Sequence, residues 1–120
     1  MNPAGGVEQW RFYTTPQGTQ IVRDEILGLV IAPRAAMLEL MQRVRSRSDE
    51  VLPREQEALG GGLFALRVSL AQNEYRAMYF HDGKFGQVLV AVRAYQKKTE
   101  KLPKNELKIA RTRRDEWLDR

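Results

Sequence analysis

Alternating apolar and polar residues dominate the second half of the chain, and a period of two is typical of strands packed against a core. The alternation is clear in residues 63–70 (LFALRVSL), and residues 74–80 (EYRAMYF) form a second strand-like segment. Residues 88–95 (VLVAVRAY) are apolar enough on both faces to lie inside a sheet. The first two segments are joined by AQN, and the Asp82-Gly83 pair after the second is typical of a hairpin turn. Three strands with such short connections predict an antiparallel meander.

The first half of the chain has one strand-like segment followed by helical patterns. Residues 8–15 (EQWRFYTT) alternate like a strand, and we expect them to join the same sheet. Apolar residues recur at helical spacing at about 19–29 and again over 31–47, where Pro33 suits a first helical turn. Residues 48–62 contain a proline and three glycines, so we expect a loop or a short helical piece there.

A third helical pattern closes the chain. It is expected to begin near Pro103, and its apolar stripe is formed by Leu107, Ala110, Trp117 and Leu118. The elements together predict an α+β fold: a small antiparallel sheet, made of the meander and the N-terminal strand, with two N-terminal helices and a C-terminal helix. We expect residues 1–120 to form a single domain in which residues 1–9 are flexible.

The positive charge of the chain is concentrated in its last part. The formal net charge is +5, and residues 1–92 contain ten basic and ten acidic side chains, whereas residues 93–120 contain ten basic and five acidic ones. A localised basic surface is typical of proteins that contact phosphates. The competing interpretation is a solvated helix face on which acidic residues alternate with basic ones, and charge alone leaves both open.

Residue types and segments that the sequence lacks argue against several kinds of site and against a secreted or membrane location. The chain has no cysteine and one histidine, so neither a disulfide framework nor a thiolate zinc site is expected, and we predict no metal and no cofactor. His81, beside the hairpin turn, is expected to be a solvated residue rather than a catalytic one. No signal-peptide pattern and no long apolar run is present, so we expect a cytoplasmic protein without a membrane partner.

Basic residues at regular strand positions are the remaining candidates for chemistry. Arg93, Tyr95 and Lys97 share one face of the third strand of the meander, whereas Arg76 joins such a cluster only through a bulge or at the sheet rim. Arginine and lysine placed around a phosphate can stabilise the transition state in which a ribose 2′-hydroxyl attacks that phosphate. This chemistry requires RNA, because DNA lacks the hydroxyl. An ordinary strand rim with solvated side chains stays the alternative.

Motifs in the second half resemble those of a known family. GGGLFALRVSL, followed by EYRAMYFHDGKFGQVLVAVRAYQKKTEKLPKNELKIARTRR, is similar to the phage Gp49-like and HigB-type branch of the RelE/ParE toxin superfamily. The matching positions are Gly62, Leu63, Phe64, Leu66, Arg67, Tyr75, Arg76, Tyr79, Phe80, Lys97, Lys98, Thr99, Lys101, Pro103, Glu106, Ala110 and Arg113. The resemblance implies a RelE-like fold and an endoribonuclease (mRNA interferase) that cuts mRNA in the ribosomal A site and thereby inhibits translation. It also implies a HigA-like antitoxin with a helix-turn-helix domain, and a toxin–antitoxin complex.

The resemblance also assigns roles to individual residues. Arg67, Arg76, Lys97 and Lys98 match the basic phosphate-contacting and catalytic positions, and Tyr79 is a catalytic candidate by proximity. RNA binding is expected from the nearby Arg93, Tyr95, Lys101, Lys104, Lys108 and Arg111.

Some positions depart from the family pattern. Leu102 stands where many members have Thr before the proline, and Arg93-Ala94 replaces a small residue or His followed by Gly. No Tyr or His follows the lysine pair, so the identity of the general base stays open. Two other functions stay open as well, a ParE-type inhibitor of DNA gyrase and a non-catalytic nucleic-acid-binding phage accessory protein.

Overall fold

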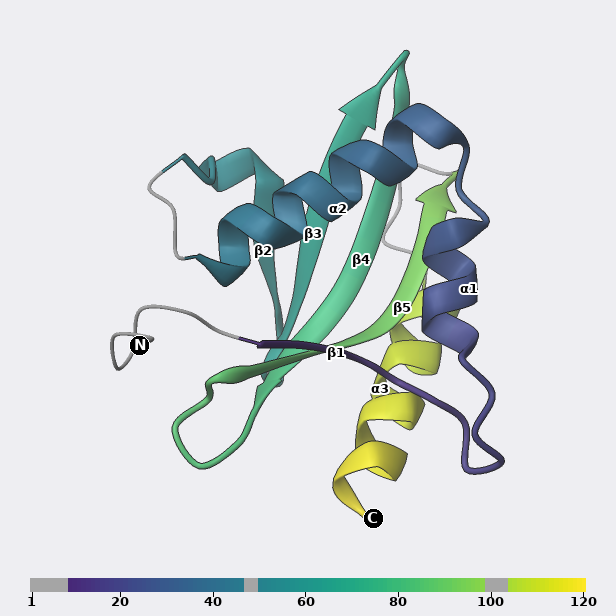
Figure 1. Cartoon of the computed structure of the whole chain (residues 1–120), viewed down its shortest axis with the longest axis vertical. Coiled ribbons are helices and arrows are strands. Elements are labelled where there is room, and N and C mark those ends of the chain that lie inside the picture. The colour runs from purple at the N-terminus through teal and green to yellow at the C-terminus, as the bar shows by residue number, and fades with distance from the viewer. Residues whose placement is uncertain (1–8, 47–49, 99–103) are drawn as a thin grey trace.

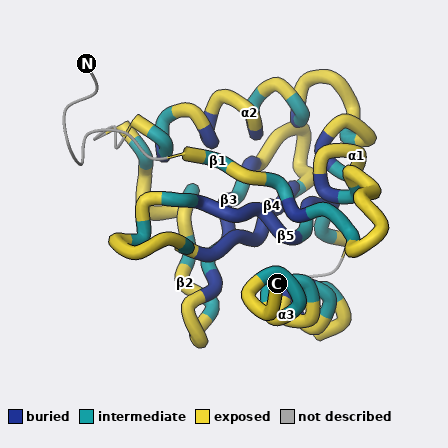
Figure 2. Tube along the Cα trace, turned by 60° about the horizontal axis from the view of Figure 1, so that its bottom comes forward, coloured by how far each residue is buried: buried dark blue, intermediate teal, exposed yellow. Residues whose placement is uncertain are grey.

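The computed structural model describes residues 9–46, 50–98 and 104–120, and within them one five-stranded sheet has the order β1-β5-β4-β3-β2 (Figure 1). The strands are β1 (Gln9–Phe12), β2 (Gln56–Gly60), β3 (Leu63–Leu70), β4 (Asn73–Asp82) and β5 (Val88–Lys97). The helices are α1 (Ile21–Leu27), α2 (Ile31–Arg45) and α3 (Lys104–Leu118), with a short 3-10 helix η1 (Pro53–Glu55). Helices α1 and α2 cover one face of the sheet and α3 covers the other, so the domain has three layers (Figure 2).

The predicted α+β architecture is confirmed, because the meander β3-β4-β5, the two N-terminal helices and the C-terminal helix are all present. Two details of the sheet differ from the prediction. β1 pairs with β5 in parallel, so the sheet is mixed and not purely antiparallel. Two predictions concern residues that the structure does not describe: the flexibility of residues 1–8 and the start of the last helix near Pro103. Gln9, which was included in the flexible segment, belongs to β1.

The second difference is a fifth strand in the segment that was expected to be a loop. β2 has the sequence QEALG, which has little intrinsic strand propensity. Gly60, Gly61 and Gly62 all adopt positive φ angles, which glycine reaches without a steric penalty, and they reverse the chain so that β2 pairs with β3. The strand therefore forms because its neighbour offers a free edge, and local composition alone does not predict it.

The turn between β3 and β4 sets the register of the two central strands. Ala71 and Gln72 have φ angles of 50° and 67°, as the two-residue turn of a tight hairpin requires. This turn places Leu70 opposite Asn73, and the ladder continues without a shift to the pair Arg67 and Arg76. Two arginines that lie nine residues apart in the sequence are therefore direct neighbours on one face of the sheet.

A β-bulge interrupts the pairing of β4 with β5. Tyr79 pairs with Ala91 and Met78 pairs with Arg93, so Val92 is the extra residue on β5. Because side chains alternate along a strand, one extra residue moves every later side chain of β5 to the opposite face. The bulge therefore brings Tyr95 and Lys97 onto the face that carries Arg76.

The core lies on both faces of the sheet. Fully buried side chains include Met37 and Leu40 of α2, Leu66 and Met78 of the central strands, and Leu89 of β5. On the helical face of α1 and α2, the indole of Trp10 donates a hydrogen bond of 2.8 Å to the carbonyl of Met41. No helix among the described residues is long and apolar enough to cross a membrane.

Candidate active site

A row of polar side chains crosses four neighbouring strands on the face of α3. Arg67 of β3 is the cross-strand partner of Arg76 of β4, which in turn is the partner of Tyr95 of β5. Glu57 of β2 extends the row, since its Oε2 lies 4.0 Å from Nη1 of Arg67. We call Glu57, Arg67, Arg76 and Tyr95 the polar row.

Two residue pairs farther along the ladder, Lys97 of β5 lies opposite Glu74 of β4. The Glu74 carboxylate is 2.7 Å from Nε of Arg76 and 3.8 Å from Nζ of Lys97, so it bridges the two cations. Arg67, Arg76 and Lys97, which the sequence selects as phosphate-contacting candidates, thus lie together on three consecutive strands. A phosphate at this place would meet cations from more than one side.

The cations of the row differ in exposure. Arg76 is 5% exposed, so it is a buried residue and not a rim residue, whereas the Arg67 side chain is 26% exposed. Burial lowers the pKa of Arg76, but the hydrogen bond and the negative charge of Glu74 outweigh it and hold the pKa above its usual value. The guanidinium therefore stays charged although it is removed from water.

Two carboxylates in the site are not among the residues selected from the sequence. Glu57 falls in the segment that was expected to be a loop, and Glu74 opens β4 without any distinguishing pattern around it. Only the cross-strand register shows that Glu74 faces Lys97. This register is not visible in the sequence.

Three buried polar atoms of the row make no hydrogen bond with any residue that the structure describes. They are Oε1 of Glu57, Nε of Arg67 and the hydroxyl of Tyr95. Within the described residues no other buried side-chain nitrogen or oxygen lacks a partner. Since buried polar groups are almost always paired in folded proteins, their concentration in one row makes it the candidate functional site.

Tyr79, the catalytic candidate by proximity, lies apart from the polar row. Tyr79 pairs with Phe64 and is fully buried on the face opposite to Arg76, because the two residues are an odd number of positions apart on β4. Its ring stacks on Phe64 with a centroid distance of 5.6 Å, and Gln56 donates a hydrogen bond to its hydroxyl. Tyr79 is a core residue on the face opposite to the polar row.

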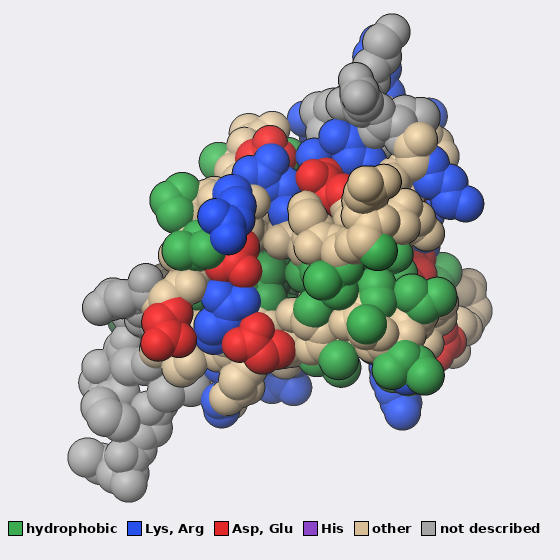
Figure 3. Space-filling view, turned by 90° about the horizontal axis from the view of Figure 1, so that it is seen from above, with side chains coloured by type: hydrophobic (Ala, Val, Ile, Leu, Met, Phe, Trp, Pro, Cys, Tyr) green, Lys and Arg blue, Asp and Glu red, His purple; other side chains and the backbone are tan. Residues whose placement is uncertain are grey.

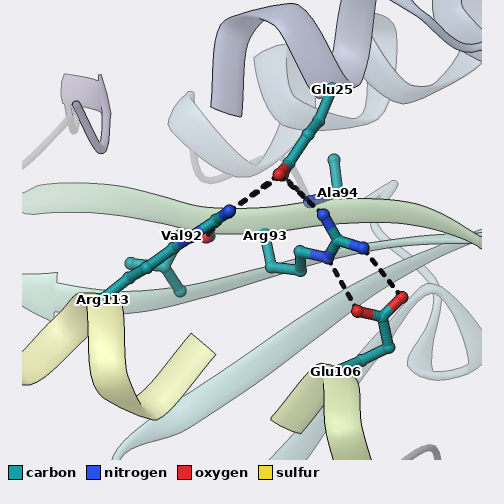
Figure 4. A network of polar contacts seen from close by, with 6 residues as sticks. All are labelled: Glu25, Val92, Arg93, Ala94, Glu106 and Arg113. Carbon is teal, nitrogen blue, oxygen red and sulfur yellow. Dashed lines mark hydrogen bonds and ion pairs between the residues drawn. The ribbon is translucent and has the colours of Figure 1, made fainter. Parts of the chain in front are cut away.

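Arg93 also has a role other than the predicted RNA binding. Its Nε donates to Glu106 of α3 at 2.8 Å, and its Nη1 donates to Glu25 of α1 at 2.7 Å. Both bonds are drawn in Figure 4. The two carboxylates neutralise the charge of this guanidinium, so it would attract a phosphate only weakly. Arg93 instead joins β5 to the helices on either side.

The same network fixes the bulge of β5. Glu25 accepts hydrogen bonds from the backbone N–H of Ala94 and from Arg113, and Arg113 also donates to the carbonyl of the bulged residue Val92 at 2.9 Å (Figure 4). β1 pairs with β5 only as far as Ala91, so these side chains take over the edge of β5 where β1 ends. The network therefore holds the backbone that orients Tyr95 and Lys97.

The remaining candidates are not members of the row. Lys98, which is predicted to be catalytic, is exposed and borders a hollow of about 480 Å³ that is also lined by Tyr95 of the row and by Arg93, Val30 and Glu106. Lys104, Lys108 and Arg111 are exposed on one side of α3, as expected, and Lys101 lies outside the described residues. His81 is exposed as well, with Nδ1 3.1 Å from the carbonyl oxygen of Gly86.

A different kind of surface lies over α1 and α2. Figure 3 shows hydrophobic side chains gathered on this side of the molecule, and Leu27, Val30, Ile31 and Leu38 are the large apolar residues exposed there. Exposed apolar clusters of this kind are typical of surfaces that protein partners cover. This apolar surface is formed by the helices that cover the sheet face opposite to the polar row.

Comparisons with known proteins give one family and two relatives. A sequence model of the family described as phage derived protein Gp49-like matches residues 24–115. Two relatives described as probable endoribonuclease HigB1 come from Mycobacterium tuberculosis, strains CDC 1551 / Oshkosh and ATCC 25618 / H37Rv. The chain is 28% identical to each over 109 residues, which cover 90% of this chain and 83% of the relative. The matched region contains every member of the polar row.

Proposed function

The chain belongs to the phage-derived Gp49-like family, and from that premise we propose that it is the toxin of a type II toxin–antitoxin system and an endoribonuclease. The observation that carries the proposal is the convergence of Arg67, Arg76 and Lys97 from three consecutive strands on one face of the sheet. The description of the relatives as probable endoribonucleases supports it. The substrate is mRNA on the translating ribosome, and its cleavage inhibits translation in the cytoplasm.

The proposed reaction needs no water and no metal ion at the scissile phosphate. The 2′-oxygen of a ribose attacks the adjacent phosphorus, the bond to the 5′-oxygen of the next nucleotide breaks, and a 2′,3′-cyclic phosphate and a 5′-hydroxyl are left. Negative charge accumulates on the phosphate oxygens in the transition state. Arg67, Arg76 and Lys97 are placed to stabilise this charge, and fixed electrostatic donors of this kind often make the largest single contribution to catalysis.

The proposed partner is a cognate antitoxin of HigA type with a helix-turn-helix DNA-binding domain, which forms a complex with the toxin. Free toxin of this activity would stop growth of the cell that makes it. The exposed apolar residues of α1 and α2 are consistent with a protein partner.

Primer extension on mRNA from induced cells tests the proposal. We expect discrete 5′ ends that appear within minutes of induction and disappear when translation of the message is blocked by removal of its start codon. An intact message pool together with a DNA-damage response would contradict the proposal and favour a gyrase inhibitor. Intact messages without DNA damage would favour a protein that binds nucleic acid without cutting it.

A further inference from the structure

Two of the three buried polar atoms without a partner among the described residues lie at the ends of the polar row, and the third, Nε of Arg67, lies within it. The row runs from Glu57 on β2 through Arg67 and Arg76 to Tyr95 on β5. The first and last members have a carboxylate oxygen and a phenol hydroxyl without a hydrogen-bond partner among the described residues, and two arginines lie between them. Burying such groups unpaired costs free energy, so a ligand that pairs them is expected.

This order suits the geometry of phosphoryl transfer. The attacking and the leaving oxygen lie roughly in line on opposite sides of the phosphorus. A phosphate held between Arg67 and Arg76 would therefore direct one of these oxygens toward β2 and the other toward β5. A proton acceptor is needed at the first oxygen and a proton donor at the second.

Resting on the proposed ribonuclease function, we propose that Glu57 is the general base and Tyr95 the general acid of the reaction. Oε1 of Glu57 takes the proton of the 2′-hydroxyl as the 2′-oxygen forms its bond to phosphorus. The bond between phosphorus and the 5′-oxygen breaks, and the 5′-oxygen takes the proton of the Tyr95 hydroxyl. Glu57 ends protonated and Tyr95 ends as a phenolate, and proton exchange with water restores both.

Glu74 is a poorer candidate for the base. Its carboxylate is already bound by Arg76 at 2.7 Å and by Lys97 at 3.8 Å, whereas Oε1 of Glu57 has no partner among the described residues. In the free protein, Glu74 binds the two cations, Arg76 and Lys97, that a phosphate would bind in the complex. A phosphate oxygen that replaces it at Arg76 comes next to the cross-strand neighbour Tyr95.

The surroundings of Tyr95 suit a proton donor. Burial raises the pKa of its hydroxyl more than the positive charge and the close approach of the Arg76 side chain lower it, so the phenol is protonated at neutral pH. The alkoxide that leaves is a far stronger base than a phenolate, and proton transfer to it is downhill. The positive charge of Arg76, the cross-strand neighbour of Tyr95, stabilises the phenolate that results.

The test combines two variants with two substrates in a reconstituted translation system. One message carries an ordinary phosphodiester at the mapped cut site, and the other carries a single linkage in which sulfur replaces the leaving 5′-oxygen. A thiolate leaves without being protonated, so the sulfur linkage bypasses the general acid but still requires the general base. The variants are Tyr95→Phe and Glu57→Gln, and Tyr75→Phe is the matched control because Tyr75 is a buried tyrosine on the opposite face of the sheet.

We expect Tyr95→Phe to cut the ordinary linkage about 100-fold to 10,000-fold more slowly, which is the usual contribution of a general acid, and to cut the sulfur linkage at the wild-type rate. Glu57→Gln is expected to cut both linkages more slowly, and Tyr75→Phe to cut both normally. Thermal unfolding of Tyr95→Phe should match the wild type or exceed it, because the removed hydroxyl has no partner among the described residues.

The following outcomes would overturn the assignment of Tyr95, the assignment of Glu57 or the ribonuclease function. A wild-type rate for Tyr95→Phe on the ordinary linkage, or an equal loss on both linkages, would show that Tyr95 is not the acid. A wild-type rate for Glu57→Gln would show that Glu57 is not the base. If the wild-type protein cuts neither message, the ribonuclease function itself is wrong, and this result is separate from the other two because it does not involve the variants.

Discussion

Arg76→Lys is expected to lower the rate of RNA cleavage about 100-fold to 1000-fold, the usual loss when one fixed electrostatic donor is removed from an active site. Lysine keeps a positive charge next to Glu74 and fills most of the buried space. It lacks the planar fork that can donate to a carboxylate and a phosphate at the same time. Arg76→Lys therefore tests the phosphate contact with less damage to the fold than Arg76→Ala, since Arg76 is only 5% exposed.

The matched control for this prediction is Arg120→Lys. Arg120 is likewise paired with a carboxylate, with Nε 2.9 Å from Oε2 of Glu116 and Nη2 2.6 Å from Oε1, but it lies beyond the end of α3. We expect Arg120→Lys to cut RNA at the wild-type rate. Equal activity of Arg76→Lys and the wild type, with circular dichroism showing both to be folded, would mean that the polar row does not bind the scissile phosphate.

Glu25→Gln is expected to lower the free energy of unfolding by about 3 kcal/mol, because removal of one partner from a buried ion pair leaves the other charges uncompensated. Glu25 is the one acceptor shared by Arg93, Arg113 and the N–H of Ala94, and its side chain is 13% exposed. A glutamine would keep one acceptor oxygen but turn an amide N–H₂ toward a guanidinium. The loss is large for a domain whose total stability is on the order of 5–15 kcal/mol.

Urea denaturation followed by tryptophan fluorescence measures this loss. Glu39→Gln is the control, because Glu39 is 61% exposed in its pair with Arg43, and exposed pairs contribute about 0–1 kcal/mol. We also expect Glu25→Gln to reduce RNA cleavage, since the network fixes the bulge that turns Tyr95 and Lys97 toward Arg76. Equally small changes for Glu25→Gln and Glu39→Gln would show that the network does not support the edge of β5.

The strands of the meander and the helices are predictable from the sequence because each has a regular apolar period. β3 was expected at residues 63–70 and spans Leu63–Leu70. β2 was not expected, because the alternation of its five residues is too weak to predict a strand. It forms by pairing with β3 across the glycine turn. The parallel pairing of β1 also depends on the path of the chain through α1 and α2, which a local pattern does not show.

The candidate site was predictable in part. The family resemblance selects Arg67, Arg76, Lys97 and Lys98. The placement of the first three together follows from the β3-β4 turn and the β5 bulge, whereas Lys98 is exposed at the end of β5. A bulge was expected as one way to bring Arg76 to the cluster, but it lies on β5 and moves the partners of Arg76 instead. Alternation along β4 already places Tyr79 on the face opposite to Arg76, so proximity in the sequence was the wrong guide for that residue.

The remaining features of the site depend on contacts between residues that are far apart in the sequence. Arg93 looked like an additional cation beside the site, and only the approach of Glu25 and Glu106 from two helices shows that its charge is already used. Glu57 and Tyr95 stand out because single atoms of them lack partners among the described residues, and a sequence holds no information of that kind.

The most direct test of the central claim is cleavage of a message that carries one 2′-deoxyribose at the mapped cut site, with the matched all-ribose message as the reference. The 2′-hydroxyl is the nucleophile in the proposed reaction, so the protein should cut the all-ribose message in the presence of translating ribosomes and leave the deoxy position intact. Cleavage at the deoxy position would contradict attack by the 2′-oxygen, and an intact all-ribose message would contradict ribonuclease activity altogether.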